Sequence, residues 1–166
     1  MTGERPAAKV ITVSDSVSAG SADDRSGPAL AQHLTDAGFD VVDRIVVPDG
    51  VGPVAAALRE ACDGFAGLVV TTGGTGFAPR DQTPEGTLEV IERAAPGLAE
   101  AMRAVDPRGR LSRGAAGVVG SCVVLNTPGS PGGAVEHLAA VLDVVPHALS
   151  LLRDPTEGHR HHHHPH

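Results

Sequence analysis

The stretch LVVTTGGTG, residues 68–76, decides how this chain can fold, because an apolar run passes directly into a glycine-rich segment. Residues 68–72 are aliphatic or β-branched, which favours a buried strand. Backbone N–H groups of the glycine-rich segment can converge on an anion, and threonine hydroxyls add further donors. A tight structural turn explains the same residues taken alone, since the Lys-Ser/Thr of a P-loop is missing and the glycine spacing differs from the dinucleotide fingerprint.

Outward from this stretch, the order of strand, loop and helix repeats, which predicts one α/β domain without internal repeats. Apolar runs predict further strands over residues 9–13, 41–47 and 121–126. In open α/β sheets, the loops that follow the carboxyl ends of the strands build the ligand site. We therefore expect the functional residues to lie in those loops.

Apolar residues at helical spacing predict the helices between these strands. Ser26 is the expected N-cap of the first helix, and Gly38 closes it. Thr83-Pro84-Glu85 has helix-start chemistry, with the Thr83 hydroxyl as the cap. Pro146 should kink or end the last helix. The other helical stripes cover residues 53–62, 98–105 and 135–142.

The composition fits a single domain with an unusual core. The 166 residues are 41% hydrophobic but include no Trp, no Tyr and only three Phe, so Val, Leu and Ala must pack the interior, and 21 Gly allow close approach. We expect a domain over residues 5–153 and a flexible His-rich tail over residues 154–166, either natural or a purification tag.

Several classes of function are disfavoured. A net charge of −7 argues against nucleic-acid binding, which needs a basic surface. The chain has no apolar run long enough for a membrane span, and residues 1–8 lack a secretory core, so a cytoplasmic protein is expected. Cys62 and Cys122 are isolated, which indicates buried free thiols. The histidines outside the tail lie in helical patterns that suggest no Ser-His-Asp triad, so the sequence gives no support to a hydrolase.

Two acidic residues stand at strand exits. Asp81 follows the glycine-rich segment, where an acid beside an anion site needs an intervening cation, so it is a candidate for magnesium binding or for a hydrogen bond to a polar ligand. It could instead pair with Arg80 or cap the nearby turn. Asp49 follows the strand 41–47, although Pro48-Asp49-Gly50 is also an ordinary turn sequence.

Two more segments complete the candidate site. Pro128-Gly129-Ser130-Pro131 follows the strand 121–126 and could add a hydroxyl and backbone amides to the same crevice. Leu111-Ser112-Arg113 supplies a guanidinium suited to gripping phosphate, with a flexible loop and a solvated arginine as the alternative.

Together these segments resemble the molybdopterin adenylyltransferase family, the Mog/MoaB group of molybdenum cofactor proteins. The resemblance extends from Ile11 to about Leu152. It rests on the ordered set of residues 12–16, 24–28, 47–49, 71–76, 80–85, 96–103, 111–113 and 128–131. It implies a three-layer α/β/α fold with a mostly parallel sheet and a homotrimer. It also implies a magnesium-dependent reaction that joins the terminal phosphate of molybdopterin to the AMP part of ATP and releases pyrophosphate.

The resemblance also implies roles for individual residues. Asp49 and Asp81 match the acids on which the family depends, so we expect Asp49 to hold magnesium or position ATP, and Asp81 to anchor the pterin end or share the metal. Arg25 is a further candidate for phosphate contact. The residues expected to hold the pterin or a phosphate are Thr72, Gly73, Gly74, Thr75, Gly76, Ser112, Arg113, Pro128, Gly129, Ser130 and Pro131.

Two other functions stay open at this point. The chain could be a trimeric carrier that stores or delivers molybdopterin without adenylylating it. It could also be another nucleotide-acting enzyme on the same fold, related to the competence-damage proteins, although we expect no second domain here. A downstream molybdenum-insertion enzyme is a candidate partner in the enzyme hypothesis, which the presence of both Asp49 and Asp81 favours.

Overall fold

The computed structural model describes residues 4–153, so the His-rich tail expected over residues 154–166 lies outside the described residues. The strands are β1 (Ala7–Val13), β2 (Asp40–Val47), β3 (Ala66–Thr72), β4 (Arg93–Ala94), β5 (Ala116–Val119) and β6 (Ser121–Thr127). The helices are α1 (Asp15–Ser18), α2 (Ser26–Asp36), α3 (Val51–Cys62), α4 (Thr83–Leu88), α5 (Pro96–Arg103), the 3-10 helix η1 (Pro107–Leu111), α6 (Pro131–Ala139) and α7 (Val145–Arg153).

The strands form one six-stranded sheet in the order β2-β1-β3-β6-β5-β4. The first four are parallel, whereas β5 runs antiparallel to β6 and β4 antiparallel to β5. The mostly parallel sheet is therefore confirmed. The sequence pattern did not predict β4 and β5, because both are short and β5 contains Gly117, which weakens a strand signal.

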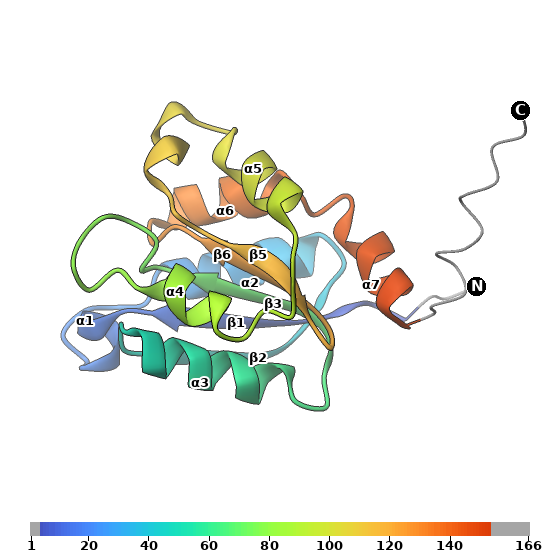
Figure 1. The fold of residues 1–166 in the computed structure, drawn as a ribbon, viewed down its shortest axis with the longest axis horizontal. Coiled ribbons are helices and arrows are strands. Elements are labelled where there is room, and N and C mark those ends of the chain that lie inside the picture. Colours follow the sequence, from blue (N-terminus) through green and yellow to red (C-terminus); the bar gives the residue numbers. More distant parts are fainter. Residues whose placement is uncertain (1–3, 154–166) are drawn as a thin grey trace, which may run out of the picture.

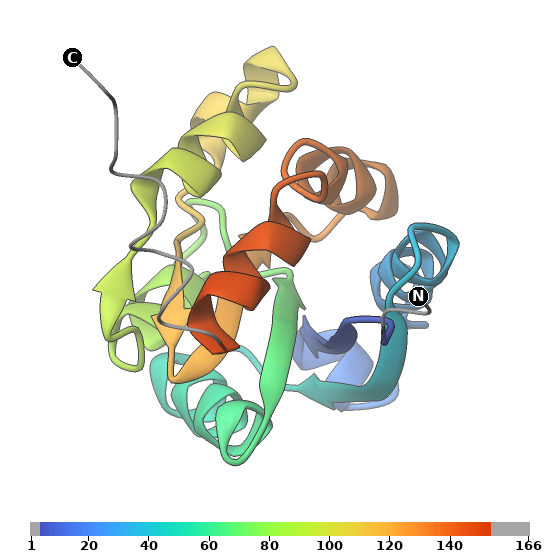
Figure 2. The same ribbon diagram turned by 90° about the vertical axis from the view of Figure 1, so that its right-hand side faces the viewer.

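Helices cover both faces of the sheet, which confirms the three layers. Viewed from the amino ends of the parallel strands, α3 lies below the sheet and α2, α6 and α7 lie above it (Figure 2). Successive residues of a strand point to opposite faces of the sheet, so they pack alternately against the helices above and below it. Val10, Leu68, Val70, Val123 and Leu125 pack in the upper core, and Ile11, Val13, Val69, Cys122 and Val124 pack in the lower one.

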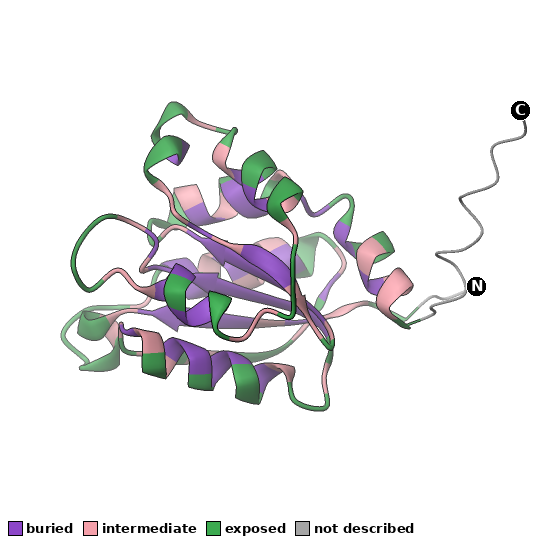
Figure 3. Cartoon of the chain, viewed as in Figure 1, coloured by how far each residue is buried: buried purple, intermediate pink, exposed green. Residues whose placement is uncertain are grey.

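The burial pattern agrees with a core made of aliphatic residues. The central strands are buried, while the helices are buried only on the side that faces the sheet (Figure 3). Cys62 and Cys122 are free thiols, as predicted, but only Cys122 is buried, because Cys62 lies at the end of α3 and stays partly exposed. Across residues 4–153, every helix is too short or too polar to cross a membrane.

Two helix ends show how local chemistry sets the boundaries. Ser26 is the first residue of α2 and not its N-cap, because the Asp24 carboxylate accepts the Gly27 N–H at 3.0 Å and does the capping. At the other end Gly38 has φ +92°, and the Phe39 N–H reaches the Leu34 carbonyl at 2.9 Å, as in a Schellman motif. The prediction that Gly38 closes this helix is therefore confirmed.

Pro146 does not end the last helix. The chain forms two helices there, α6 and α7, and Pro146 lies in the first turn of α7. A proline is tolerated at that position because the first N–H groups of a helix have no intrahelical acceptor. The expected break is real, but it falls before Pro146.

The topology gathers the strand exits at one end of the molecule. β1 lies between β2 and β3, and the chain crosses from β1 to β2 through α2 on one face and from β2 to β3 through α3 on the other. Connections on opposite faces separate at this point and leave a crevice at the carboxyl ends of the strands. The loops after β1 and β3 lie together at the left of Figure 1, opposite the amino ends of the strands.

Candidate active site

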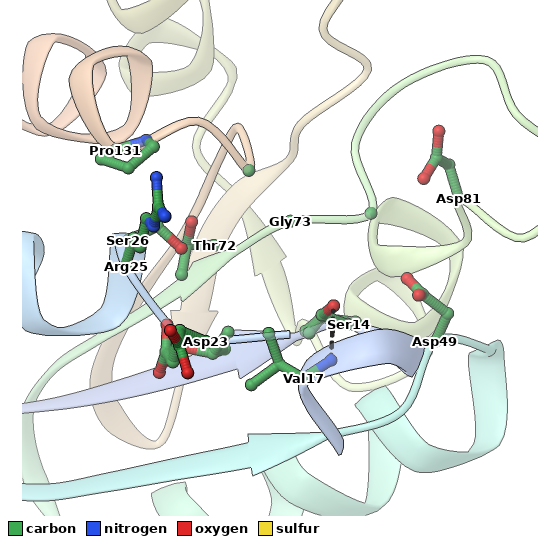
Figure 4. A pocket seen from close by; sticks show the side chains of 15 residues that line it. Ser14, Val17, Asp23, Arg25, Ser26, Asp49, Thr72, Gly73, Asp81 and Pro131 are labelled. Carbon is green, nitrogen blue, oxygen red and sulfur yellow. Dashed lines mark hydrogen bonds between the residues drawn. The ribbon is translucent and has the colours of Figure 1, made fainter. Parts of the chain in front are cut away.

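Two cavities open side by side at the carboxyl ends of the parallel strands. The first, which we call the β1–β3 cavity, is lined by residues that follow these two strands, such as Ser14 and Gly73, and has a volume of about 380 Å³. The second, the β3–β6 cavity, is lined by residues such as Thr75 and Ser130 and has a volume of about 580 Å³. Both are lined by Gly74, Asp81 and Gly129, so they meet at the glycine-rich loop. Figure 4 shows the first of them, with Asp49 and Asp81 on one side and Asp23 and Arg25 on the other.

Gly73 and Gly74 give the loop its shape, and no larger residue fits at either position. Their φ angles are +99° and +69°, a region that L residues rarely adopt. A Cβ on Gly73 would collide with the backbone oxygen of Val13, and a Cβ on Gly74 with the Thr83 hydroxyl. The loop therefore lies directly against the end of β1, and its glycines are required by both space and conformation.

A buried polar network holds the strand ends in register. The Asn126 amide donates to the hydroxyls of Thr71 and Thr87, at 2.9 and 3.0 Å. Thr87 then donates to the Thr83 carbonyl at 2.7 Å, and the Thr83 hydroxyl donates to the Gly73 carbonyl at 2.8 Å. The prediction that Thr83 caps its helix is wrong, because its hydroxyl is turned to the glycine-rich loop.

The predicted threonine donors are used in different ways. Thr72 donates its hydroxyl to the Pro128 carbonyl at 2.7 Å, which ties the loop after β3 to the loop after β6. That proton is therefore occupied within the chain. Thr75 lines the β3–β6 cavity, and its hydroxyl makes no hydrogen bond with any other residue in the range 4–153. Of the two, Thr75 is the hydroxyl free to donate to a ligand.

Asp49 is held at the cavity by an exchange of hydrogen bonds with Asp15. Asp49 Oδ2 accepts the Asp15 N–H at 2.9 Å, and the Asp49 N–H donates to Asp15 Oδ1 at 3.1 Å. Arg80 binds both oxygens of Asp15 at 3.0 Å and donates to the Asp49 carbonyl. The alternative that Asp81 pairs with Arg80 is therefore wrong, and Asp15 is a site residue that the sequence did not single out.

The free oxygen of Asp49 faces the glycine-rich loop. Oδ1 makes no hydrogen bond among the described residues, and a Cβ on Gly74 would come within 3.1 Å of it. Burial raises the pKa of Asp49, and the negative charges of Asp15 and Asp81 add to that effect. By contrast, the hydrogen bond from Arg80 lowers the pKa of Asp15. The cavity therefore holds a carboxylate that a cation would stabilise.

Asp81 stands on the other side of Gly74 and lines both cavities. Its Oδ2 accepts the Ala78 N–H at 3.0 Å, so it also caps a turn, as one alternative held. A Cβ on Gly76 would come within 2.9 Å of this oxygen, which again places the carboxylate against the loop. Asp49 and Asp81 therefore flank the same crevice.

A cationic group lies opposite these acids. Arg25 lines the β1–β3 cavity, and its guanidinium has no hydrogen bond or ion pair to the rest of residues 4–153. Its neighbour Asp24 is fully engaged, since its carboxylate accepts from the Thr12 hydroxyl and the Gly27 N–H. Arg25 is thus placed where it could contact an anionic ligand.

The β3–β6 cavity is lined by Ser112 and by Pro128, Gly129 and Ser130, whereas Pro131 lines the β1–β3 cavity. Ser130 also caps α6, since its hydroxyl accepts the Gly133 N–H at 3.2 Å. Arg113 lines neither cavity, because its guanidinium is bound to the glycine-rich loop and to Glu85.

Four charged or titratable side chains in this second cavity were not predicted: Asp106, Arg108, Glu136 and His137. His137 is buried, and burial lowers its pKa, which favours the neutral imidazole. Its place in a helix gave no signal of a site, because the residues that surround it come from η1 and from the loop after β6.

Comparison with known proteins gives a consistent result. A family model described as "Probable molybdopterin binding domain" matches residues 9–147. The "Molybdopterin adenylyltransferase" of Helicobacter pylori is 35% identical, over 86% of this chain and 85% of its own length. The crystal structure of "Molybdopterin biosynthesis enzyme MoaB" from Thermus thermophilus is 45% identical, with a TM-score of 0.83, over 89% of this chain and 96% of that one.

Some relatives are longer than this chain. The "Molybdenum cofactor biosynthesis bifunctional protein" of Synechococcus elongatus is 35% identical over 91% of this chain, which spans 49% of that protein. The Drosophila melanogaster protein "Molybdenum cofactor synthesis protein cinnamon" is 37% identical over 87% of this chain, which spans 25% of it. The chain thus spans half or less of these two relatives.

Proposed function

The chain belongs to the molybdopterin-binding Mog/MoaB family of molybdenum cofactor biosynthesis, and on that basis we propose that it transfers the AMP part of ATP to the terminal phosphate of molybdopterin. The observation that carries the proposal is the meeting of two cavities at Gly74 and Asp81, with Asp49 beside them. A reaction between two bound substrates needs two such spaces with a common point.

We assign the β3–β6 cavity to molybdopterin and the β1–β3 cavity to ATP. Thr75, Ser112 and Ser130, which the resemblance connects with the pterin or its phosphate, line the β3–β6 cavity. Asp49, expected to position ATP or its metal, lines the other cavity together with Arg25. The two reacting phosphates would meet beside Gly74.

The chemistry needs no covalent protein intermediate. An oxygen of the terminal phosphate of molybdopterin attacks the α-phosphorus of ATP and forms the new P–O bond. The bond between that phosphorus and the bridging oxygen to the β-phosphate breaks, and pyrophosphate leaves with the electron pair. The chain contributes position and charge: backbone N–H groups of the glycine-rich loop, the Thr75 hydroxyl and the Arg25 guanidinium can hold phosphate oxygens.

Magnesium fits the donor set at this point. Within residues 4–153 no group of three or more His, Cys, Asp or Glu side chains could hold a metal by itself. Mg²⁺ commonly binds through one or two carboxylates and completes its shell with water and substrate phosphates. Asp49, with its free Oδ1, and Asp81 supply such a pair. A bound Mg²⁺ would neutralise charge on the phosphates.

The purified chain supplied with molybdopterin, ATP and Mg²⁺ should form adenylylated molybdopterin and release one pyrophosphate for each product, and EDTA should stop both. Mass spectrometry of the pterin and a coupled pyrophosphate assay measure this. The competing function is a carrier that binds molybdopterin only. It would be supported by pterin binding without pyrophosphate release at any Mg²⁺ concentration.

Asp81→Asn should weaken molybdopterin binding about tenfold, because a neutral amide is a weaker hydrogen-bond acceptor for the pterin than the carboxylate that lines both cavities. The amide oxygen of Asn can still accept the Ala78 N–H, so the loop should keep its turn. Titration of the pterin absorbance or fluorescence gives the affinity. Unchanged affinity would move Asp81 out of the pterin pocket and leave it with a metal role alone.

We also propose that the chain assembles as a homotrimer and passes its product to a molybdenum-insertion enzyme, as the resemblance implies. Both proposals can be tested by sedimentation and by product transfer with the purified partner.

A further inference from the structure

We propose that Arg113 is a positioning residue that fixes the glycine-rich loop and Asp81, in place of the phosphate contact expected from its sequence. The proposal rests on the function proposed above, for which Asp81 must stand at the junction of the two cavities. It is carried by the contacts of one guanidinium with Gly76, with Asp81 and with Glu85.

The guanidinium of Arg113 spans both ends of the loop that carries Asp81. Nε donates to the Gly76 carbonyl at 2.8 Å, and Nη2 donates to the Asp81 carbonyl at 2.6 Å. The Arg113 N–H donates to the Thr75 carbonyl at 2.9 Å. The start and the end of segment 75–81 are therefore bound to one residue.

The third contact attaches this loop to a helix. Nη1 of Arg113 pairs with the Glu85 carboxylate in the first turn of α4. Glu85 and Arg113 line neither cavity. This location argues against direct contact between Arg113 and a substrate, because all three guanidinium nitrogens donate to protein acceptors.

The backbone on which Arg113 stands is itself held. The Arg103 guanidinium donates to the Gly114 carbonyl at 2.7 Å, and the Ala115 N–H donates to the Asn126 side chain at 3.0 Å. The segment is thus anchored to α5 and to β6. A fixed base and a planar fork with several donors allow Arg113 to hold a loop in one position, which a lysine ammonium cannot reproduce.

The first test measures the loop without any substrate. Hydrogen exchange of the amides in segment 76–82 should become about tenfold faster in Arg113→Lys, with a smaller increase in Glu85→Gln, while the strands exchange as in the wild type. Arg110→Lys is the matched control, since Arg110 is exposed in η1 and, among the described residues, its side chain donates only to the Pro107 carbonyl. Wild-type exchange of the loop in Arg113→Lys would overturn the proposal.

The second test is a double-mutant cycle on the kcat/KM of pyrophosphate release. Arg113→Lys should lower kcat/KM about tenfold in the wild type but less than twofold in the Asp81→Asn background, because a residue that acts through Asp81 has little effect once that carboxylate is gone. Effects that multiply would make Arg113 a direct substrate contact and overturn the proposal. If the chain proves to be a carrier, the loop exchange still decides the role of Arg113.

Discussion

Asp49→Asn should lower the turnover of pyrophosphate release roughly 100- to 1,000-fold while changing molybdopterin affinity less than about twofold. Asp49 offers a free carboxylate oxygen in the ATP-side cavity, and metal-assisted charge stabilisation contributes several kcal/mol, with each ~1.4 kcal/mol equal to a factor of ten. Stopped-flow pyrophosphate release and pterin titration separate the two effects.

The control for this substitution is Asp43→Asn. Asp43 lies on the exposed edge strand β2, lines neither cavity and loses the same charge. Its turnover should equal that of the wild type. An equal loss in both variants would show that the effect of Asp49→Asn comes from net charge and not from its place in the site.

The stability of the Asp49→Asn variant follows from the sign of the pKa shift. Burial raises the pKa of Asp49 in the folded chain, so the contribution of this group to stability is full below the pKa of the unfolded chain and is lost as the pH rises through the folded pKa. Asn carries no such penalty. The variant should therefore be at least as stable as the wild type at neutral pH, and its thermal unfolding midpoint checks that the loss of turnover does not come from unfolding.

Gly73→Ala should be the most damaging single-methyl substitution in the glycine-rich loop. The residue would have to keep a φ of +99° with its Cβ against the backbone oxygen of Val13, which cannot move without shifting β1. Backbone strain of about 1–2 kcal/mol and overpacking of about 1–3 kcal/mol predict a loss of roughly 2–5 kcal/mol. The midpoint temperature of thermal unfolding should fall by roughly 5–15 °C, and turnover should be lost.

Substitutions at two other glycines distinguish the effect of backbone strain from that of overpacking. Gly120 also has a positive φ, +55°, but no atom lies within 4 Å of the place for its Cβ, so Gly120→Ala reports the strain alone and should cost about 1 kcal/mol. Gly52 lies in α3 with the same open space, and Gly52→Ala should stabilise by about 0.5–1 kcal/mol. If Gly73→Ala behaved like Gly120→Ala, the loop would not lie against β1.

The sequence predicted most elements of this fold because their signals are local. Apolar runs marked β1, β2, β3 and β6, and the glycine after α2 marked its end. The missed strands, β4 and β5, are short and depend on pairing with β6 for their existence. Strand pairing is a tertiary property, so a short run alone could not reveal it.

The sequence predicted which residues lie at the candidate site better than it predicted their hydrogen-bond partners. Asp49 and Asp81 do flank one crevice, but the roles of Thr83 and Arg113 depend on acceptors that only the fold brings near. Thr83 reaches Gly73 across 10 residues, and Arg113 reaches Gly76 across 37. Thr83 also has good helix-capping chemistry, so the local explanation was chosen. The competing acceptor, a loop carbonyl, carries no sequence signature.

The central claim is that Asp49 and Asp81 hold one magnesium-bound phosphate group beside Gly74. A crystal structure of the chain with Mg²⁺, molybdopterin and an ATP analogue that cannot be cleaved between its α- and β-phosphates tests it directly. The account predicts that both carboxylates would hold the metal, with the α-phosphate beside the glycine-rich loop. A nucleotide or metal bound away from the Thr72–Gly76 segment would contradict it.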